Sequence, residues 1–293
     1  MPTFQKSALL PLKGVRILSL ALNLPGPAAL MRCRSMGAVC VKLQPLSGDP
    51  MGVYNPLAYA EMHQGIKLLQ ADLKSAQGQK LLHRELQQAQ VLITSFRPSA
   101  LRKLGLGWKN LHSTYPALSQ VAIVGAPGQR AEEPGHDLTY LAENDLLTGL
   151  EMPATLYADM AGSLMASEAI LQAVMHQRVM RKGVYAEVAL SAAAGYLALP
   201  RAWGLTTSGA AVGGGHAGYR IYPCSDGRVA LAALEPHFAA RLCAAAGLQF
   251  TQAAGMYGPE AHQQIADFLR AQTRQQLDAL ASSDDIPLYT LPN

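Results

Sequence analysis

Three side chains in this sequence are suited to acid–base or nucleophilic chemistry: His136, Asp159 and Glu235. His136 lies in PGHDLTYLAEN, where a glycine-containing turn gives way to a predicted helix. A histidine there can act as a general base while a carboxylate orients its second ring nitrogen, although the same position is typical of a structural helix cap. Asp159 opens an apolar helix among small residues, so it is either an N-cap or a partly desolvated carboxylate that serves as nucleophile or base.

Glu235 follows directly on the apolar run VALAAL, which has the composition of a buried strand. Burying an unpaired carboxylate is costly, because the charge loses its hydration without compensation. We therefore expect Glu235 to have a partner, and a histidine is the obvious candidate.

Two basic residues are candidates for binding phosphate. Arg97, in SFRPSA, and Lys42, after AVCV, each lie at or just beyond the end of a predicted strand. A guanidinium can hold two phosphate oxygens at once, and an ammonium supplies a point charge; alternatively, each is an ordinary surface charge. The turn LPGPAA, with Gly26 and Pro27, has neither Walker nor G-x-G-x-x-G spacing, so it does not support an ATP or NAD site and can equally be a plain strand-to-helix turn.

The elements that must position these residues alternate between strand and helix. GVRILSLAL and AVCVKLQ are predicted strands that flank the helix AALMRCRSMGA, and this is the length of a βαβ unit. ADLKSAQGQKLLHRELQQA, with Asp72 as its possible N-cap, is a predicted helix, and QVLITSF and ALSQVAIVGA are further strands. The pattern predicts an α/β fold with an open parallel sheet over residues 12 to about 190, and ligands bind beyond the carboxyl ends of such strands, here residues 25–27, 42–49, 96–98 and 125–137.

The sequence also predicts a division into two lobes. Residues 1–203 form a large α/β domain that includes a long helix at 158–180, and residues 204–218 are a glycine-rich linker or active-site loop. Residues 219–293 form a smaller α+β domain, with two strands joined at Ser225-Asp226-Gly227 and helices from about Pro236.

Composition narrows the class of partner. A net charge of +4 without a long basic run agrees with an anionic small molecule and argues against nucleic acid. No apolar segment approaches the roughly 20 residues that cross a bilayer, so we expect a cytoplasmic protein. The four cysteines have no metal-site spacing and are expected to be reduced thiols.

The order of the segments resembles that of the family III CoA-transferases (the CaiB/BaiF group), and in particular their α-methylacyl-CoA racemase branch. The resemblance rests on LKGVRILSLALNLPGPAA, GAVCVKLQPLSGDP, VLITSFRPSALRKLGLGW, PGHDLTYLAEN, LYADMAGS and YRIYPCSDGRVALAALEPHF, in this order. It implies a catalytic Asp159, with His136 hydrogen-bonded to Glu235 on the opposite face of the substrate. It also implies that Arg97 and Lys42 contact the CoA phosphates, and we place Gly26, Pro27 and Asp137 at the CoA site as well.

This resemblance implies a racemase or epimerase that acts on the α-carbon of a 2-methylacyl-CoA. The alternative is a CoA-transferase in which Asp159 is the nucleophile, and a further alternative is an inactive relative that only binds CoA. We expect no metal and no cofactor beyond the CoA of the substrate. A homodimer is expected, but its interlocking is open, because the C-terminal segment that returns to the large domain is short or missing in this sequence.

Overall fold

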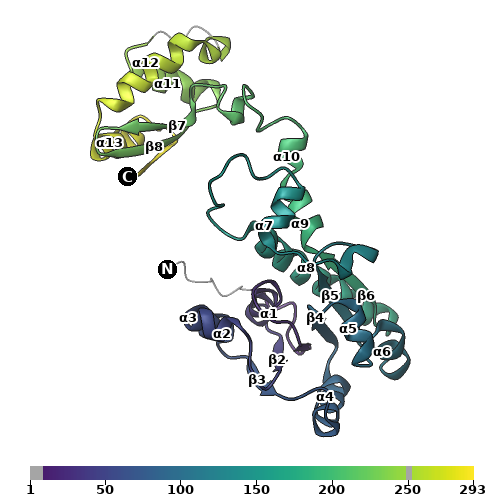
Figure 1. Cartoon of the computed structure of the whole chain (residues 1–293). Coiled ribbons are helices and arrows are strands. Elements are labelled where there is room, and N and C mark those ends of the chain that lie inside the picture. The colour runs from purple at the N-terminus through teal and green to yellow at the C-terminus, as the bar shows by residue number, and fades with distance from the viewer. Residues whose placement is uncertain (1–8, 249–252) are drawn as a thin grey trace. The chain divides into compact units, whose positions relative to one another are not determined.

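A computed structural model describes residues 9–248 and 253–293 of the chain (Figure 1). The chain divides into two compact units, Met1–Ala198 and Leu199–Asn293. The predicted linker at 204–218 thus falls inside the second unit, where Ala211–Gly213 forms a short 3-10 turn. Each unit has its own hydrophobic core.

The first unit is built on a parallel sheet of six strands in the order β3-β2-β1-β4-β5-β6. The strands are β1 (Arg16–Ser19), β2 (Val39–Gln44), β3 (Lys67–Gln70), β4 (Val91–Thr94), β5 (Ser119–Val124) and β6 (Tyr185–Ala189). Strand order reverses beside β1, which pairs with β2 on one side and with β4 on the other. This is the order of a Rossmann sheet, so the predicted fold class is confirmed.

Helices cover both faces of this sheet, because successive strand residues point to opposite faces. Ile17 joins the core cluster with α1 (Pro25–Ser35), α7 (Asp137–Glu143), α8 (Tyr157–Met180) and α9 (Leu190–Leu197). Its neighbour Leu18 joins a second cluster with α4 (Ala76–Gln88), α5 (Pro98–Lys103) and α6 (Trp108–Thr114). Two short helices, α2 (Met51–Tyr54) and α3 (Pro56–Met62), pack against α1.

Two local predictions in this unit need correction. Ser75, not Asp72, caps α4: the Ser75 hydroxyl accepts a hydrogen bond from the Gly78 amide at 3.0 Å, whereas Asp72 accepts from the Lys74 amide in the preceding turn. Strand β3 was not predicted, because it is an edge strand whose side chains are mostly exposed and give no buried apolar run.

The second unit is a three-stranded antiparallel sheet packed against helices. The predicted hairpin is confirmed as β7 (Tyr219–Cys224) and β8 (Gly227–Ala232), and β9 (Leu288–Leu291) adds a strand that was not predicted. The helices are α10 (Leu199–Ala202), α11 (Pro236–Ala245), α12 (Pro259–Arg270) and α13 (Arg274–Ser283), with a 3-10 turn at Ala253–Tyr257.

Candidate active site

A cavity of about 320 Å³ lies at the carboxyl ends of β1, β4 and β5, within the first unit. Leu22 and Asn23 follow β1, Ser95 and Phe96 follow β4, and all four line the cavity. Because β1 and β4 flank the point where strand order reverses, this is the crevice in which Rossmann-like sheets bind ligands. The structure therefore places a cavity where three of the four predicted ligand-binding regions meet, because Pro25, Phe96 and Gly125 belong to three of these regions and all line it.

Asp159 lies in the first turn of α8 and lines this cavity. It is not the N-cap, because Leu156 precedes the helix in that position. Its own backbone N–H is one of the first-turn donors that an α-helix leaves without an internal partner. That N–H donates to Oδ1 of Asp137 at 2.9 Å, so a carboxylate from α7 caps α8 and fixes the position of Asp159.

The environment raises the pKa of the Asp159 carboxyl to about 6. Burial is the main cause, because it disfavours the charged form, and the negative charge of Asp137 adds to it while His136 opposes both. A carboxyl with a pKa near 6 is a stronger base than a free aspartate and is still mostly ionised at neutral pH. This is the tuning expected of a group that gives and takes protons during turnover.

His136 is the N-cap residue of α7, as predicted, and it also lines the cavity. Its backbone N–H donates to the Thr139 hydroxyl at 3.1 Å, and that hydroxyl donates back to the His136 carbonyl at 2.8 Å. These backbone bonds hold the helix start in place while the residue stays exposed. His136 and Asp159 thus reach one cavity from two different helices.

Tyr140 lines the same side of the cavity and Asp137 lies buried next to His136 in the chain, and the sequence did not reveal the roles of these two residues. Asp137, which we had placed at the CoA site, has a buried side chain that holds Asp159. The Tyr140 hydroxyl packs closely against Gly125 and Gly135. A Cβ added to these glycines would lie only 2.3 Å and 2.6 Å, respectively, from that hydroxyl. The i, i+3 spacing of Asp137 and Tyr140 places both on one helix face, and this is the signal that could have linked them.

The other residues predicted to contact the ligand differ in their exposure and in whether they line the cavity. Arg97 is exposed, lines the cavity and precedes the first turn of α5, so a phosphate contact there stays a prediction. Gly26 and Pro27 are buried in α1, and it is Pro25 that lines the cavity. A Cβ on Gly26 would lie 2.2 Å from the Ala21 Cβ, so this glycine permits close packing between the start of α1 and β1.

Lys42 and Glu235 differ most from what we expected of them. The Lys42 side chain is fully buried beside Asp49, so its ammonium has no exposed surface for a phosphate to contact. Glu235 is exposed, at the N-cap position of α11 in the second unit. Our argument that Glu235 needs a partner because it is buried is therefore wrong, and the pairing of His136 with Glu235 stays a prediction.

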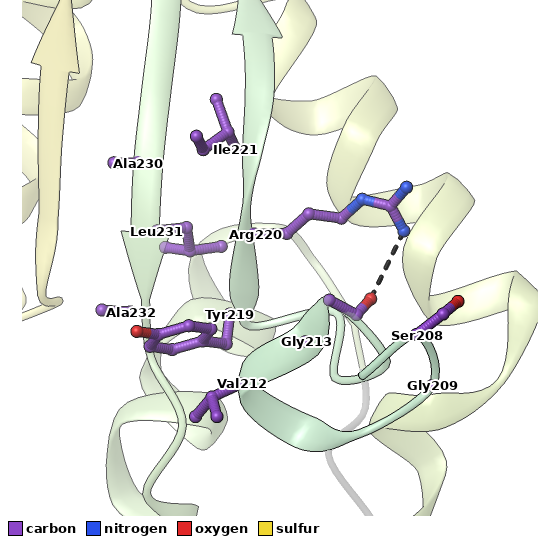
Figure 2. A pocket seen from close by; sticks show the side chains of 11 residues that line it. Ser208, Gly209, Val212, Gly213, Tyr219, Arg220, Ile221, Ala230, Leu231 and Ala232 are labelled. Atoms are coloured by element: carbon purple, nitrogen blue, oxygen red, sulfur yellow. Dashed lines mark hydrogen bonds between the residues drawn. The ribbon is translucent and has the colours of Figure 1, made fainter. Parts of the chain in front are cut away.

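A cavity of about 630 Å³ lies in the second unit, over β7 and β8 (Figure 2). Figure 2 shows its floor of strand side chains, including Ile221 and Ala230, and the glycine-rich loop beside them. Among the described residues that line it, Arg220 alone is charged, and it donates to the Gly214 carbonyl at 3.4 Å. Tyr219 also lines this cavity, and its described lining contains no carboxylate and no histidine, the side chains that most often transfer protons in enzymes.

Two features are absent from the part of the chain that the structure describes. No cluster of three His, Cys, Asp or Glu side chains there could hold a metal ion. No helix among those residues combines the length and the apolar character that a membrane crossing needs. The four cysteines are buried and not joined in disulfides.

The relatives of this chain are named for two kinds of activity, CoA transfer and racemisation. A probable fatty acyl-CoA transferase of Mycobacterium tuberculosis is 28% identical over 207 residues, which are 63% of this chain and 50% of that protein. The α-methylacyl-CoA racemase of Mus musculus is 29% identical over 285 residues, 90% of this chain and 73% of the racemase. The (R)-2-hydroxy-4-methylpentanoate CoA-transferase of Clostridioides difficile is 29% identical over 143 residues, 44% of this chain and 35% of that protein. The chain thus spans half or less of the two transferases.

Solved structures and a family profile agree with the fold. A hypothetical protein from Mycobacterium tuberculosis matches with a TM-score of 0.84 and 22% identity, over 95% of this chain and 83% of that one. A CaiB/BaiF family protein from Brucella suis matches with a TM-score of 0.82 and 22% identity, over 97% and 85%. The profile of CoA-transferase family III matches residues 12–291. The chain belongs to CoA-transferase family III, which includes racemases as well as CoA-transferases.

Proposed function

We propose that this protein is an acyl-CoA racemase or epimerase that removes and returns a proton at the α-carbon of a 2-methylacyl-CoA. The observation that carries the proposal is that Asp159 and His136 line one cavity at the carboxyl end of the sheet. Racemisation needs two groups that exchange protons with the same carbon, and these two residues are such a pair.

The reaction consists of two proton transfers through an enolate. The Asp159 carboxylate takes the α-proton, which the thioester acidifies, and the electron pair of the C–H bond moves into the enolate. His136, in its protonated form, then returns a proton to the same carbon from the other side. The reverse sequence starts with neutral His136 and protonated Asp159, so neither direction consumes a co-reactant.

The substrate brings the only cofactor that the proposal needs, the CoA group itself. Arg97, exposed at the cavity, is the residue proposed to hold a CoA phosphate, because its guanidinium can bind two oxygens at once. A homodimer and a cytoplasmic location remain parts of the proposal that rest on the family resemblance.

A CoA-transferase is the second candidate, because several relatives carry that name. In this reaction the Asp159 carboxylate attacks the thioester carbonyl, and CoA thiolate leaves as an acyl anhydride forms. The thiolate then attacks the Asp159 carbonyl of the anhydride, which releases the carboxylic acid and leaves CoA as an aspartyl thioester. An acceptor acid takes the CoA through a second anhydride. The same buried carboxylate thus serves both candidates, in one as a base and in the other as a nucleophile.

Isotope exchange separates the candidates. The protein is incubated with (R)-2-methylacyl-CoA in deuterated water without an acceptor acid, and the α-carbon is examined by mass spectrometry and chiral analysis. We expect deuterium at the α-carbon together with loss of optical purity, and neither with Asp159→Asn.

Two other results would contradict the racemase. Hydroxamate formation at Asp159 on addition of hydroxylamine, without deuterium exchange, would identify a transferase. Calorimetric binding of CoA with neither exchange nor transfer would identify a relative that only binds.

A further inference from the structure

A buried ion pair lies beside the candidate site, and the proposed chemistry does not use it. Lys42, on β2, and Asp49, in the loop after β2, have no exposed side-chain surface and contact each other. A buried charge is tolerated only when it is paired and further hydrogen-bonded. The further hydrogen bonds of Lys42 and Asp49 therefore indicate what this pair does.

The Asp49 carboxylate holds the turn between β1 and α1. Both of its oxygens accept from the backbone N–H of Asn23, at 3.1 and 3.2 Å. Oδ1 also accepts from the backbone N–H of Met51 at 3.0 Å. Asn23 lines the cavity and has a φ of 62°, in the left-handed region that is unfavourable for most residues. Such a conformation persists where neighbouring contacts impose it.

A second bond holds the same turn from the other side. The amide of Leu22 donates to the Ser95 hydroxyl at 3.1 Å, and Ser95 follows β4. Residues 22 and 23 are therefore tied to the strands on both sides of β1. This turn is the wall of the cavity from which α1 begins.

Lys42 is in turn held by a fixed set of partners. Its ammonium lies 3.0 Å from Nε2 of His63, and Nδ1 of His63 lies 2.7 Å from the Tyr59 carbonyl. Because an ammonium can only donate, Nε2 accepts and Nδ1 carries the proton, so His63 is neutral. Burial lowers the pKa of His63, in agreement with this assignment. One cation and one anion thus face each other in a closed network.

We infer that Lys42 and Asp49 are positioning residues for the candidate site: Lys42 fixes the Asp49 carboxylate, and Asp49 fixes the Asn23 turn in the cavity wall. This role replaces the phosphate contact expected of Lys42, whose ammonium is enclosed. The inference rests on the proposed function only in that turnover at the cavity is one of its two readouts.

The two roles of Lys42 differ in which kinetic constant they affect. A residue that holds a CoA phosphate contributes to substrate binding, so its loss raises KM. A residue that holds the cavity wall in its reactive geometry lowers kcat when it is lost, and KM changes little. Loss of stability alone changes neither constant while the protein stays folded.

The chain offers a matched control pair at the opposite end of β1. Arg16, the first residue of β1, contacts Glu85 at 2.7 Å, and the Glu85 side chain is only 3% exposed. Glu85→Gln therefore removes a buried carboxylate on α4 that pairs with β1, but at the end of the strand away from the cavity. It reports what the loss of a buried ion pair costs without a change at the Asn23 turn.

The experiment compares wild type, Glu85→Gln, Asp49→Leu, which removes both acceptor oxygens, and the double variant Lys42→Met with Asp49→Leu. The double variant replaces the ion pair with apolar side chains of similar size, which is often neutral for stability, but it leaves the Asn23 amide without its acceptor. The measurements are Tm, hydrogen exchange by mass spectrometry over residues 20–30, and kcat and KM for deuterium exchange well below each Tm.

We expect both Asp49 variants to raise hydrogen exchange over residues 20–30 and to lower kcat at least about tenfold, with KM within about threefold of wild type. The double variant keeps the low kcat even where its Tm recovers, and Glu85→Gln lowers Tm with kcat unchanged. The inference is overturned if exchange over residues 20–30 does not increase, if the Asp49 variants behave like Glu85→Gln, or if only KM rises. Wild type without turnover would instead refute the proposed function, and hydrogen exchange would still decide whether Asp49 holds the turn.

Discussion

The two cavities differ more in the chemistry of their linings than in size. The described lining of the second unit's cavity, about 630 Å³, consists of apolar side chains and glycines together with Ser208, Tyr219 and Arg220. The cavity of the first unit, about 320 Å³, is lined by His136, Asp159, Glu133 and Arg97 among its residues. Of these two cavities, only the smaller has a carboxylate and a histidine in its described lining, so volume alone would have favoured the other one.

The cause of this difference is sheet topology. In a parallel sheet, the loops that follow neighbouring strands meet at one edge, so residues distant in sequence converge there. Three helices, α1, α7 and α8, begin at this edge, and helix N-termini favour negative charge nearby. An antiparallel hairpin such as β7–β8 offers its cavity mainly strand side chains and one loop.

The largest effect that could break this comparison is expected at Asp159. Asp159→Asn keeps the shape of the side chain but cannot take a proton, so we expect kcat to fall by about 10² to 10⁴-fold. The measurement is deuterium exchange into the acyl-CoA, and the comparison variant is Glu133→Gln, which changes another acid of the same lining. Equal losses in the two variants would show that the assay senses the charge of the cavity and not a catalytic carboxylate.

The same variant should be more stable than wild type at neutral pH. Because the folded pKa is raised from 3.8 to about 6, the folded state holds a proton between these pH values that the unfolded state has released. Wild-type stability therefore falls, relative to Asp159→Asn, as pH rises from about 4 to 6 and stays lower above it. We expect a gain on the order of 1–2 kcal/mol in the free energy of unfolding at pH 7.5, and much less at pH 4, by urea denaturation; a loss at pH 7.5 would argue for a structural Asp159.

A smaller effect is expected at Asp137. Asp137→Asn removes the charge that helps to raise the Asp159 pKa, yet its amide oxygen can still accept from the Asp159 N–H. The acidic limb of the kcat–pH profile should move to lower pH, on the order of half a unit. Glu133→Gln serves again as the control, because the Glu133 carboxylate pairs with Arg130 at 3.0 Å. The acidic limb of the kcat–pH profile of this variant should stay where it is in wild type. A shift to higher pH would contradict the assigned cause.

The smallest effect is expected in the second cavity. Arg220→Ala removes the one charged side chain among the described lining residues and the bond to the Gly214 carbonyl. Because the described lining has neither a carboxylate nor a histidine, kcat should stay within about twofold of wild type, and stability should change by about 0.5 kcal/mol or less. A tenfold loss of kcat with unchanged Tm would show that the second cavity takes part in turnover and would erase the contrast between the two.

Local patterns in the sequence determined the elements of the parallel sheet, and the start of a helix at His136. Strand and helix periodicities arise within a few residues, so the alternation that makes a Rossmann-like sheet is visible in GVRILSLAL or QVLITSF without any tertiary contact. The edge strand β3 was missed for the same reason, since exposed side chains leave no periodic signal.

Only the tertiary structure decided which charges meet. Asp137 bonds to the amide of a residue 22 positions away, and Lys42 is buried because Asp49 and His63 fold over it. No short-range pattern distinguishes a lysine at the end of a strand that reaches solvent from one enclosed by a later loop. The sequence by itself named Asp159 and His136, whereas the fold showed that Asp137 holds the first and that Lys42 lies in the structure behind the cavity wall. Contacts between distant segments are set by packing, and packing is not periodic.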